Sequence, residues 1–259
     1  MRIGIIGSGN VAYHLIRVCV QSGASIFVHA RNQLKLADLK SEFPTITCLE
    51  SADFTALDID LVLISVKDDA LNTVFNSFTY HPNTLVAHTS GNQVIQPNGR
   101  HSNVGVFYPL QTFSKSNPID WNTTPILIEA GSEVGIDLLE KAATLIHAPF
   151  FETNKDQRKA IHVAAVLASN FVNHLIGKAD SFLKSQDVDY HILQPLVKET
   201  IRKAFANPPF DVQTGPAIRH DRLTLAQHLK QLDADPLLQK IYTDITESIQ
   251  KTSNLDTNK

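Results

Sequence analysis

Apolar residues in the first half of the chain fall into short runs separated by amphipathic segments. The runs at residues 3–6 and 61–66 are continuous, which is typical of strands buried on both faces of a parallel sheet. The segments between the runs have apolar positions at helical spacing. The predicted strands are 3–6, 24–31, 45–49, 60–66, 84–88, 103–107 and 125–129, and the predicted helices are 11–20, 68–78 and 131–147. This alternation predicts an α/β fold with a mostly parallel sheet and helices on both of its faces.

The pattern changes near residue 151, and from there apolar residues recur only at helical spacing. A first long segment contains no proline and one glycine, Gly177, and a loop rich in proline and glycine interrupts the later helices. The predicted helical segments are 156–185, 192–206, 223–232 and 237–249. We therefore predict two domains, an α/β domain over residues 1–152 and an all-helical domain over residues 153–259. The polar tail from Lys251 is expected to fray.

Bulk composition narrows the class of protein. The 259 residues, 43% of them hydrophobic, provide for one large or two modest domains with sizeable cores. A net charge of −3 offers no basic surface for nucleic acid or an anionic membrane, and the apolar runs are too short to cross a bilayer. Cys19 and Cys48 form no metal or disulfide motif, and the first strand begins too early to leave room for a signal peptide. We expect a cytoplasmic protein without metal, nucleic-acid or membrane partners.

A glycine motif directly follows the first predicted strand. Residues 2–12 read RIGIIGSGNVA, so the strand runs into the pattern G-x-G-x-x-A. Gly7 permits the tight turn, Gly9 lets the backbone approach a pyrophosphate, and Ala12 lets the helix pack closely on the strand. The N-terminus of that helix presents N–H groups to the phosphates. The motif predicts a dinucleotide site, and the alternative is an ordinary glycine turn in an α/β domain.

The end of the second strand bears on which dinucleotide binds. An NAD site usually has an acidic residue there, whereas this chain reads His29-Ala30-Arg31-Asn32. A guanidinium at this place pairs with a 2′-phosphate, so the sequence favours NADP; the alternative is a solvated arginine. The predicted cofactor contacts are Gly7, Ser8, Gly9, Asn10, Val11, Ala12, Arg31, Asn32, Val66 and Lys67.

Several further segments carry a resemblance to a known family. They read HTSG at 88–91, GVFYPLQT at 105–112, HVAA at 162–165, ASNF at 168–171 and TGPAIRHD at 214–221, with His228-Leu229 following. The chain resembles the bacterial family that joins a Rossmann-like domain to a domain of unknown function, DUF2520, within the 6-phosphogluconate dehydrogenase-like superfamily. Tyr108 stands where this family usually has a histidine, and His220 where it usually has a glycine. The resemblance implies an oxidoreductase and leaves its substrate open.

Candidate catalytic residues lie in these segments. Ser90 follows a strand at the edge of the sheet where ligands bind, and either bonds a substrate or only caps a turn. His162 and Asn170 share a helix with Ser169 and Asn173, where the polar groups either line a cleft or form a satisfied core network.

The general acid is not the one that the superfamily uses. The superfamily often places a lysine one turn before the helix asparagine, but here that residue is Val166. The general acid is therefore His162 or Tyr108, and an imidazole has the more suitable ordinary pKa.

Arg219 follows a Gly-Pro loop and suits a carboxylate or phosphate on a substrate. For the neighbouring Asp221, the favoured interpretation is a cap on the helix that begins near Leu223. Every histidine lies outside a recognisable metal motif, so no metal site is predicted.

The leading interpretation is an NADP-dependent oxidoreductase that moves a hydride between NADP(H) and a small carbonyl, imine or hydroxyl compound held between the domains. One alternative is an inactive nucleotide-binding sensor or scaffold, and another is a reductase that uses the deazaflavin F420. Apolar residues cover most of the circumference of the helix at 156–185, which a domain of this size does not enclose alone. Because related superfamily members dimerise through this region, we also expect a homodimer.

Arg31 yields the first testable prediction. Calorimetric titration should show that NADP(H) binds at least about tenfold more tightly than NAD(H), a difference of roughly 1.4 kcal/mol. Arg31→Ala should remove most of this preference, because the guanidinium is the group that pairs with the 2′-phosphate. Equal affinities, or an unchanged ratio in the variant, would refute the assignment.

Overall fold

The structure is a computed structural model that describes residues 1–99 and 101–256. The strands are β1 Arg2–Ile6, β2 Ser25–His29, β3 Thr47–Cys48, β4 Asp53–Phe54, β5 Leu61–Ile64, β6 Thr79–Tyr80, β7 Leu85–His88, β8 Val104–Pro109, β9 Ile126–Ala130 and β10 Phe150–Glu152. The α-helices are α1 Asn10–Gln21, α2 Gln33–Glu42, α3 Leu71–Ser77, α4 Glu133–Leu145, α5 Lys155–Ala165, α6 Phe171–Lys184, α7 Gln194–Ala206, α8 Arg222–Gln231 and α9 Pro236–Asp256. Short 3₁₀ helices are η1 Asp68–Ala70, η2 Trp121–Thr123 and η4 Tyr190–Leu193, and η3 Val166–Asn170 is a π-helix.

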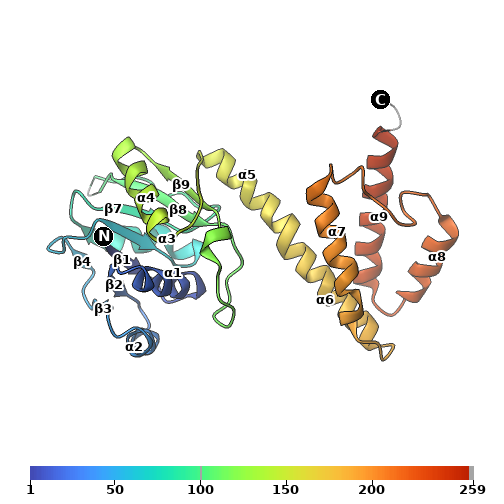
Figure 1. Cartoon of the computed structure of the whole chain (residues 1–259), viewed down its shortest axis with the longest axis horizontal. Coiled ribbons are helices and arrows are strands. Elements are labelled where there is room, and N and C mark those ends of the chain that lie inside the picture. Colours follow the sequence, from blue (N-terminus) through green and yellow to red (C-terminus); the bar gives the residue numbers. More distant parts are fainter. Residues whose placement is uncertain (100, 257–259) are drawn as a thin grey trace. The chain divides into compact units, whose positions relative to one another are not determined.

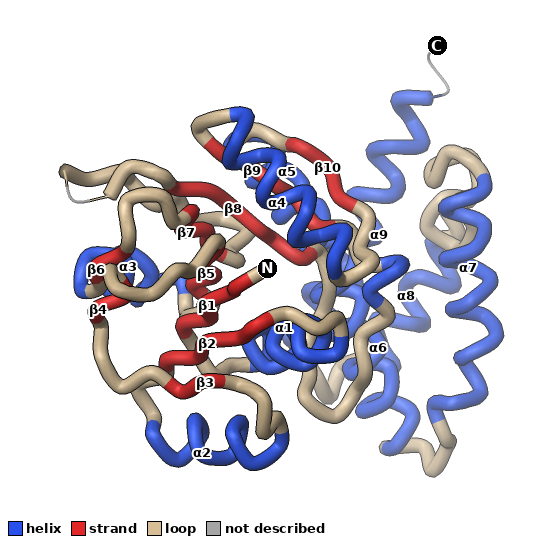
Figure 2. The backbone as a smooth tube through the Cα atoms, turned by 60° about the vertical axis from the view of Figure 1, so that its left-hand side comes forward, coloured by secondary structure: helices blue, strands red, loops and turns tan. Residues whose placement is uncertain are grey.

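One eight-stranded sheet organises the first part of the chain (Figures 1 and 2). Its strand order is β10-β9-β8-β7-β5-β1-β2-β3. The strands from β3 to β8 are parallel, and β9 pairs antiparallel with β8. The chain reverses direction across the sheet between β1 and β5, which is the switch point where doubly wound folds bind dinucleotides. The predicted α/β class with a mostly parallel sheet is confirmed.

Helices pack on both faces of this sheet. Alternate residues of β5 belong to different apolar clusters: Leu61 and Leu63 join one with α1, α2 and α4, and Val62 and Ile64 join another with α3. This division follows from the two-residue period of a strand. The continuous apolar run is therefore read correctly as a strand covered on both sides.

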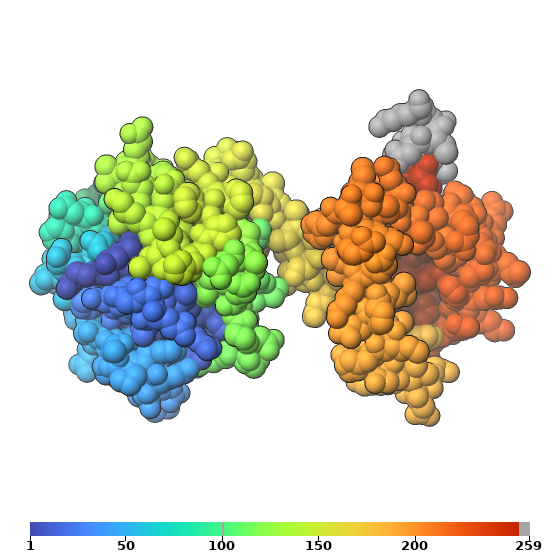
Figure 3. Space-filling model, in the orientation of Figure 1, coloured from blue at the N-terminus to red at the C-terminus, as the bar shows by residue number. Residues whose placement is uncertain are grey.

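The chain divides into two compact units, Met1–Ala168 and Ser169–Lys259. Their colours differ in Figure 3, where the first runs from blue to yellow and the second from orange to red. The second unit contains helices and no strand among its described residues, as predicted. The contact boundary lies inside a continuous helical segment, Lys155–Lys184, whereas the sequence places the domain boundary at 152/153, just after β10. The first half of that helical segment thus belongs to the same compact unit as the sheet, and Arg158 is the one residue of α5 that is buried there.

The long helical segment is not one regular α-helix. A capping box begins it, in which Asn154 and Gln157 each bond the other's backbone N–H. The π-helical turn η3 then interrupts the 3.6-residue period. On a regular α-helix His162, Ser169 and Asn173 would lie in one narrow stripe, and η3 breaks this alignment.

The other differences from the sequence prediction are local. Strands β2 and β5 are one or two residues shorter at each end than predicted, β8 ends two residues later, and helix α2 was not predicted. The two-residue strands β4 and β6 pair in a small separate sheet, and β10 extends the main sheet; neither has a pattern long enough to read. The tail from Lys251, which was expected to fray, belongs to α9 as far as Asp256. Residues 257–259 lie outside the described residues.

Large apolar side chains are exposed along the long helical segment. Val163, Leu167 and Phe171 succeed one another at four-residue spacing and are 61%, 57% and 54% exposed. By length and hydropathy the segment Lys155–Lys184 is also the one helix of the described residues that qualifies as a possible membrane span, and none of its apolar window is buried. Apolar runs alone had indicated no such segment, because the helix includes scattered polar residues. The absence of a membrane partner therefore stays a prediction.

Candidate functional site

The glycine turn lies at the carboxyl end of β1, beside β5. Gly7 has φ +136°, and its N–H donates to the carbonyl of His29 on β2. A Cβ at this position would lie 2.1 Å from the carbonyl oxygen of Ser65, just past β5. Only glycine therefore fits between the two strands while holding this backbone angle.

Beyond that turn the backbone is open to a ligand. No atom lies within 4 Å of the place where a Cβ on Gly9 would stand. Gly9 is the N-cap of α1, no side chain caps the helix, and its first turn contains no acidic residue. The free N–H groups and the helix dipole leave this end suited to an anion, so these residues fit the pyrophosphate of a dinucleotide. Asn10 instead bonds the carbonyl of Phe113 through its side chain.

The remaining predicted cofactor contacts lie after the neighbouring strands. Arg31 is exposed just past β2, and the side chain of Asn32 accepts from the backbone N–H of Lys35 as the N-cap of α2. Val66 and Lys67 follow β5, with Lys67 exposed. All of these residues lie at the carboxyl edge of the parallel strands.

The turn after β7 is held by several hydrogen bonds. The Oγ of Ser90 accepts from the backbone N–H groups of Asn92 and Gln93 at 3.2 and 3.0 Å. The N–H of Ser90 donates to Nδ1 of the buried His88 at 3.1 Å. Burial, assisted by the nearby charge of Arg158, lowers the pKa of His88 to about 3. Ser90 therefore caps a turn, as one sequence interpretation held, while its hydroxyl hydrogen stays available to a ligand.

Tyr108 and His162 meet above this turn. The Oη of Tyr108 lies 3.1 Å from Nδ1 of His162, and the rings pack edge to face with centroids 5.9 Å apart. A Cβ on Gly91 would lie 2.5 Å from Nδ1 of His162 and 2.8 Å from Cζ of Tyr108. Burial raises the pKa of Tyr108, with a smaller opposing effect from Arg158. The structure thus brings Tyr108 and His162 together over the Ser90–Gly91 turn.

Sequence reasoning missed one residue of this cluster, Arg158. It lies one turn before His162 on α5 and is 1% exposed, and its guanidinium bonds Glu129 on β9 and the carbonyls of Ser90 and Gly91. An arginine on a helix and a glutamate at the end of a strand are usually solvated. The four-residue spacing to His162 places both on one face of the helix and is the only signal in the sequence.

The other predicted residues lie in the second unit. Asn170 ends η3 and is exposed, as is Asn173, so these two do not form the satisfied core network that was one alternative. Arg219 is exposed before α8. Asp221 is the N-cap of α8 and accepts from the backbone N–H of Thr224, as expected. His220, between them, has φ +52°, a backbone angle that glycine adopts more readily than other residues.

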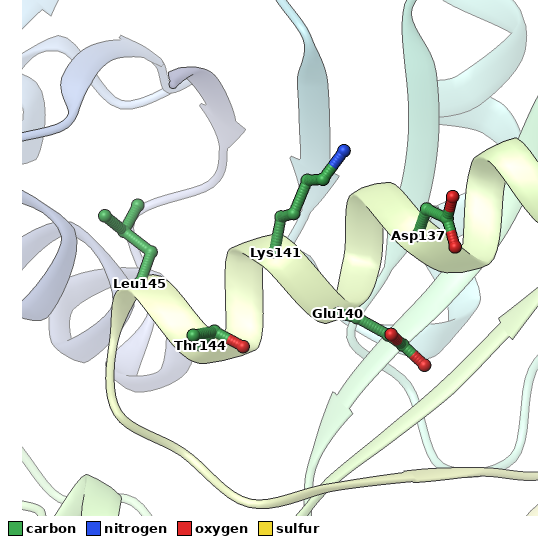
Figure 4. Close-up of a pocket in the computed structure, with 5 residues that line it drawn as sticks. All are labelled: Asp137, Glu140, Lys141, Thr144 and Leu145. Carbon is green, nitrogen blue, oxygen red and sulfur yellow. The ribbon is translucent and has the colours of Figure 1, made fainter.

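A shallow depression elsewhere on the first unit is not part of this cluster. It is lined by Asp137, Glu140, Lys141, Thr144 and Leu145, which all project from α4 (Figure 4). None of them comes from the carboxyl edge of the parallel strands. Among the described residues no group of three or more histidine, cysteine, aspartate or glutamate side chains is arranged to hold a metal ion.

Two family models match different parts of the chain. Residues 2–90 match the model described as NADP oxidoreductase coenzyme F420-dependent. Residues 124–249 match the model of a domain of unknown function, DUF2520. The first covers the glycine turn and Ser90, and the second covers Glu129, Arg158 and His162. No curated protein matches the chain.

Solved structures match over nearly the whole length. BF3122 from Bacteroides fragilis, described as a candidate NADP oxidoreductase, is 30% identical with a TM-score of 0.86, over 96% of this chain and 98% of that chain. TM1727 from Thermotoga maritima is 18% identical with a TM-score of 0.69, over 98% and 99%. An imine reductase from Streptomyces aurantiacus is 11% identical with a TM-score of 0.73, over 100% of both chains. The last two show a shared fold.

The buried His88 predicts a pH dependence of stability. Between about pH 6.5 and pH 3 the His88 imidazole is protonated in the unfolded chain and neutral in the native protein. The free energy of unfolding therefore falls as the pH falls. From pH 7 to pH 5 the loss should be about 2 kcal/mol. Denaturant unfolding at both values should show this loss in the wild type and a smaller one in His88→Asn, which keeps an acceptor for Ser90. The same pH dependence in both proteins would contradict the assignment.

Proposed function

Because the chain belongs to the family of NADP oxidoreductases that join a Rossmann-like domain to DUF2520, we propose that it reduces a small imine or carbonyl compound at the Ser90–Tyr108–His162 cluster. One observation carries this proposal: a paired phenol and imidazole lie over the turn that follows β7, at the sheet edge that also carries the glycine motif predicted to bind NADP.

The residues supply what such a reduction requires. NADPH, bound through the glycine turn, provides the hydride that reduces the carbon of the C=N or C=O bond. The electron pair of that bond moves to nitrogen or oxygen, which must then receive a proton. Tyr108 and His162 share one hydrogen bond and hold exchangeable protons on both partners, so the pair is equipped to deliver it. The hydroxyl of Ser90 is a further donor on the turn.

The imine is the first substrate class to test because an imine reductase shares the fold. F420 is a second hydride partner to test, since the family model over residues 2–90 carries that coenzyme in its description. Asn170 and Arg219 stay predictions as substrate-binding residues. A cytoplasmic location is likewise part of the proposal.

Removal of the proton source tests the reaction. NADPH oxidation should be followed with a panel of cyclic imines, small ketones and oxidised F420. His162→Gln should lower kcat by about 10² to 10⁴, the usual cost of losing a general acid, while NADPH affinity changes little. The matched control is His81→Gln, an exposed histidine between β6 and β7. NADPH binding without turnover on any compound would favour the sensor interpretation instead.

We also propose that two copies of the chain associate through the long helical segment. Its apolar residues Val163, Leu167 and Phe171 are exposed, and further apolar side chains on α7, Leu196 and Phe205, are 65% and 88% exposed. Monomeric soluble proteins rarely expose apolar surface on this scale. A second copy of the same segment offers a matching apolar surface, as expected for a symmetric interface.

Light scattering in detergent-free buffer tests the association. The wild type should have about twice the chain mass of 28.6 kDa at micromolar concentration. Leu167→Asp combined with Phe171→Asp should shift the mass toward one chain, because two buried carboxylates would face the partner. Leu34→Asp is the control, since Leu34 is 79% exposed on α2 in the first unit. A single-chain mass, or recovery only from membranes with detergent, would refute the dimer.

A further inference from the structure

The guanidinium of Arg158 is buried, and each of its three nitrogens is hydrogen-bonded. Its Nε donates to one oxygen of Glu129 at 2.6 Å, and one terminal nitrogen approaches the other oxygen at 3.5 Å. Its other terminal nitrogen donates to the carbonyls of Ser90 and Gly91 at 3.2 and 3.0 Å. Arg158 therefore joins three separate elements: the helix α5, the strand β9 and the turn after β7.

Stability alone does not account for this arrangement. Removal of two charges from water costs about as much as their mutual attraction returns, and apolar replacements of buried ion pairs are often neutral or stabilising. The pair does provide a fixed orientation, because a planar guanidinium and a carboxylate joined by two hydrogen bonds can adopt only a narrow range of relative positions.

The position of Arg158 on α5 places its hydrogen bonds next to the Tyr108–His162 pair. It lies four residues before His162 on the same face of α5. The carbonyls that it bonds belong to the turn on which His162 and Tyr108 rest, where a single added methyl group at Gly91 would overlap both side chains. The arginine thus ties the helix that carries the imidazole to the turn beneath it.

We propose that Arg158, oriented by Glu129, is a positioning residue that sets the Ser90–Gly91 turn against the Tyr108–His162 pair. The inference rests on the proposed function, because it assigns a role within that site. The charges of Arg158 and Glu129 should also act on the phenol of Tyr108 whether or not the protein turns over a substrate.

The pKa of the Tyr108 phenol depends on the charges around it. The groups that face it are Arg158 and His162 from α5 and Asp68 from η1, with His88 and Glu129 on the neighbouring strands. Burial raises its pKa, Arg158 lowers it and Asp68 raises it. Removal of the charge of Arg158 should therefore raise the pKa of Tyr108. Removal of the charge of Glu129 leaves the arginine unbalanced and should lower it.

The test uses Arg158→Lys, Arg158→Gln and Glu129→Gln in the full chain, with Arg202→Gln as the matched control. Arg202 pairs with Glu199 on α7 and both side chains are exposed, so its loss removes an arginine ion pair that includes no residue of the cluster. The phenol of Tyr108 is titrated by phenolate absorbance, as the difference between each protein and the same protein carrying Tyr108→Phe. NADPH affinity, kcat and KM are measured beside it.

We expect opposite shifts of the Tyr108 titration in Arg158→Gln and Glu129→Gln, and none in Arg202→Gln. Arg158→Lys, which cannot form the fork, should lower kcat about 10²-fold, the cost of a misplacement of about 1 Å, with NADPH affinity nearly kept. If Arg158→Gln does not fold, Glu129→Gln and Arg158→Lys carry the test.

Two results would overturn the inference: an unshifted Tyr108 titration in the folded variants, or wild-type kcat in Arg158→Lys. If the wild type itself shows no turnover, the proposed function fails, and the titration still decides whether this pair acts on Tyr108.

Discussion

The contact between Arg158 and Glu129 constrains the first unit more than any other polar interaction described above. A permanently charged group that is 1% exposed requires a carboxylate close by, and here the partner is 17% exposed at the end of β9. Loss of one member of such a pair costs about 3 to 5 kcal/mol, because the other charge is left buried. The pair therefore ties helix α5, strand β9 and the turn after β7 to one another, and the site that they carry is held on regular elements rather than on a free loop.

The sheet determines where that rigid site lies. Parallel strands bring the glycine turn after β1, the residues after β5 and the Ser90 turn after β7 to one edge. The antiparallel β9 then returns along β8 and delivers Glu129 to the same neighbourhood, opposite Val106. The glycine turn that is suited to coenzyme phosphates and the turn beneath the Tyr108–His162 pair thus lie at the same edge of one sheet. This arrangement suits hydride transfer between a bound dinucleotide and a small second molecule.

Much of this was predictable from the sequence, for identifiable physical reasons. Buried parallel strands have continuous apolar runs, and the turn after β1 needs a glycine at position 7, where φ is positive and the carbonyl of Ser65 leaves no room for a Cβ. Arg158 was not predictable, because its burial depends on a glutamate 29 residues earlier whose position is set by the pairing of β8 with β9. The π-helical turn at Val166–Asn170 was also hidden, since its residues have ordinary helical pattern and propensity.

A crystal structure of the NADP⁺ complex is the measurement that tests the central claim most directly. The account predicts the pyrophosphate on the N–H groups at Gly9 and the start of α1. It also predicts the nicotinamide C4 beside the Ser90–Gly91 turn, with space for a substrate atom about 3 Å from both C4 and the Tyr108–His162 pair. A nicotinamide ring directed away from this turn, with Tyr108 and His162 out of its reach, would contradict it.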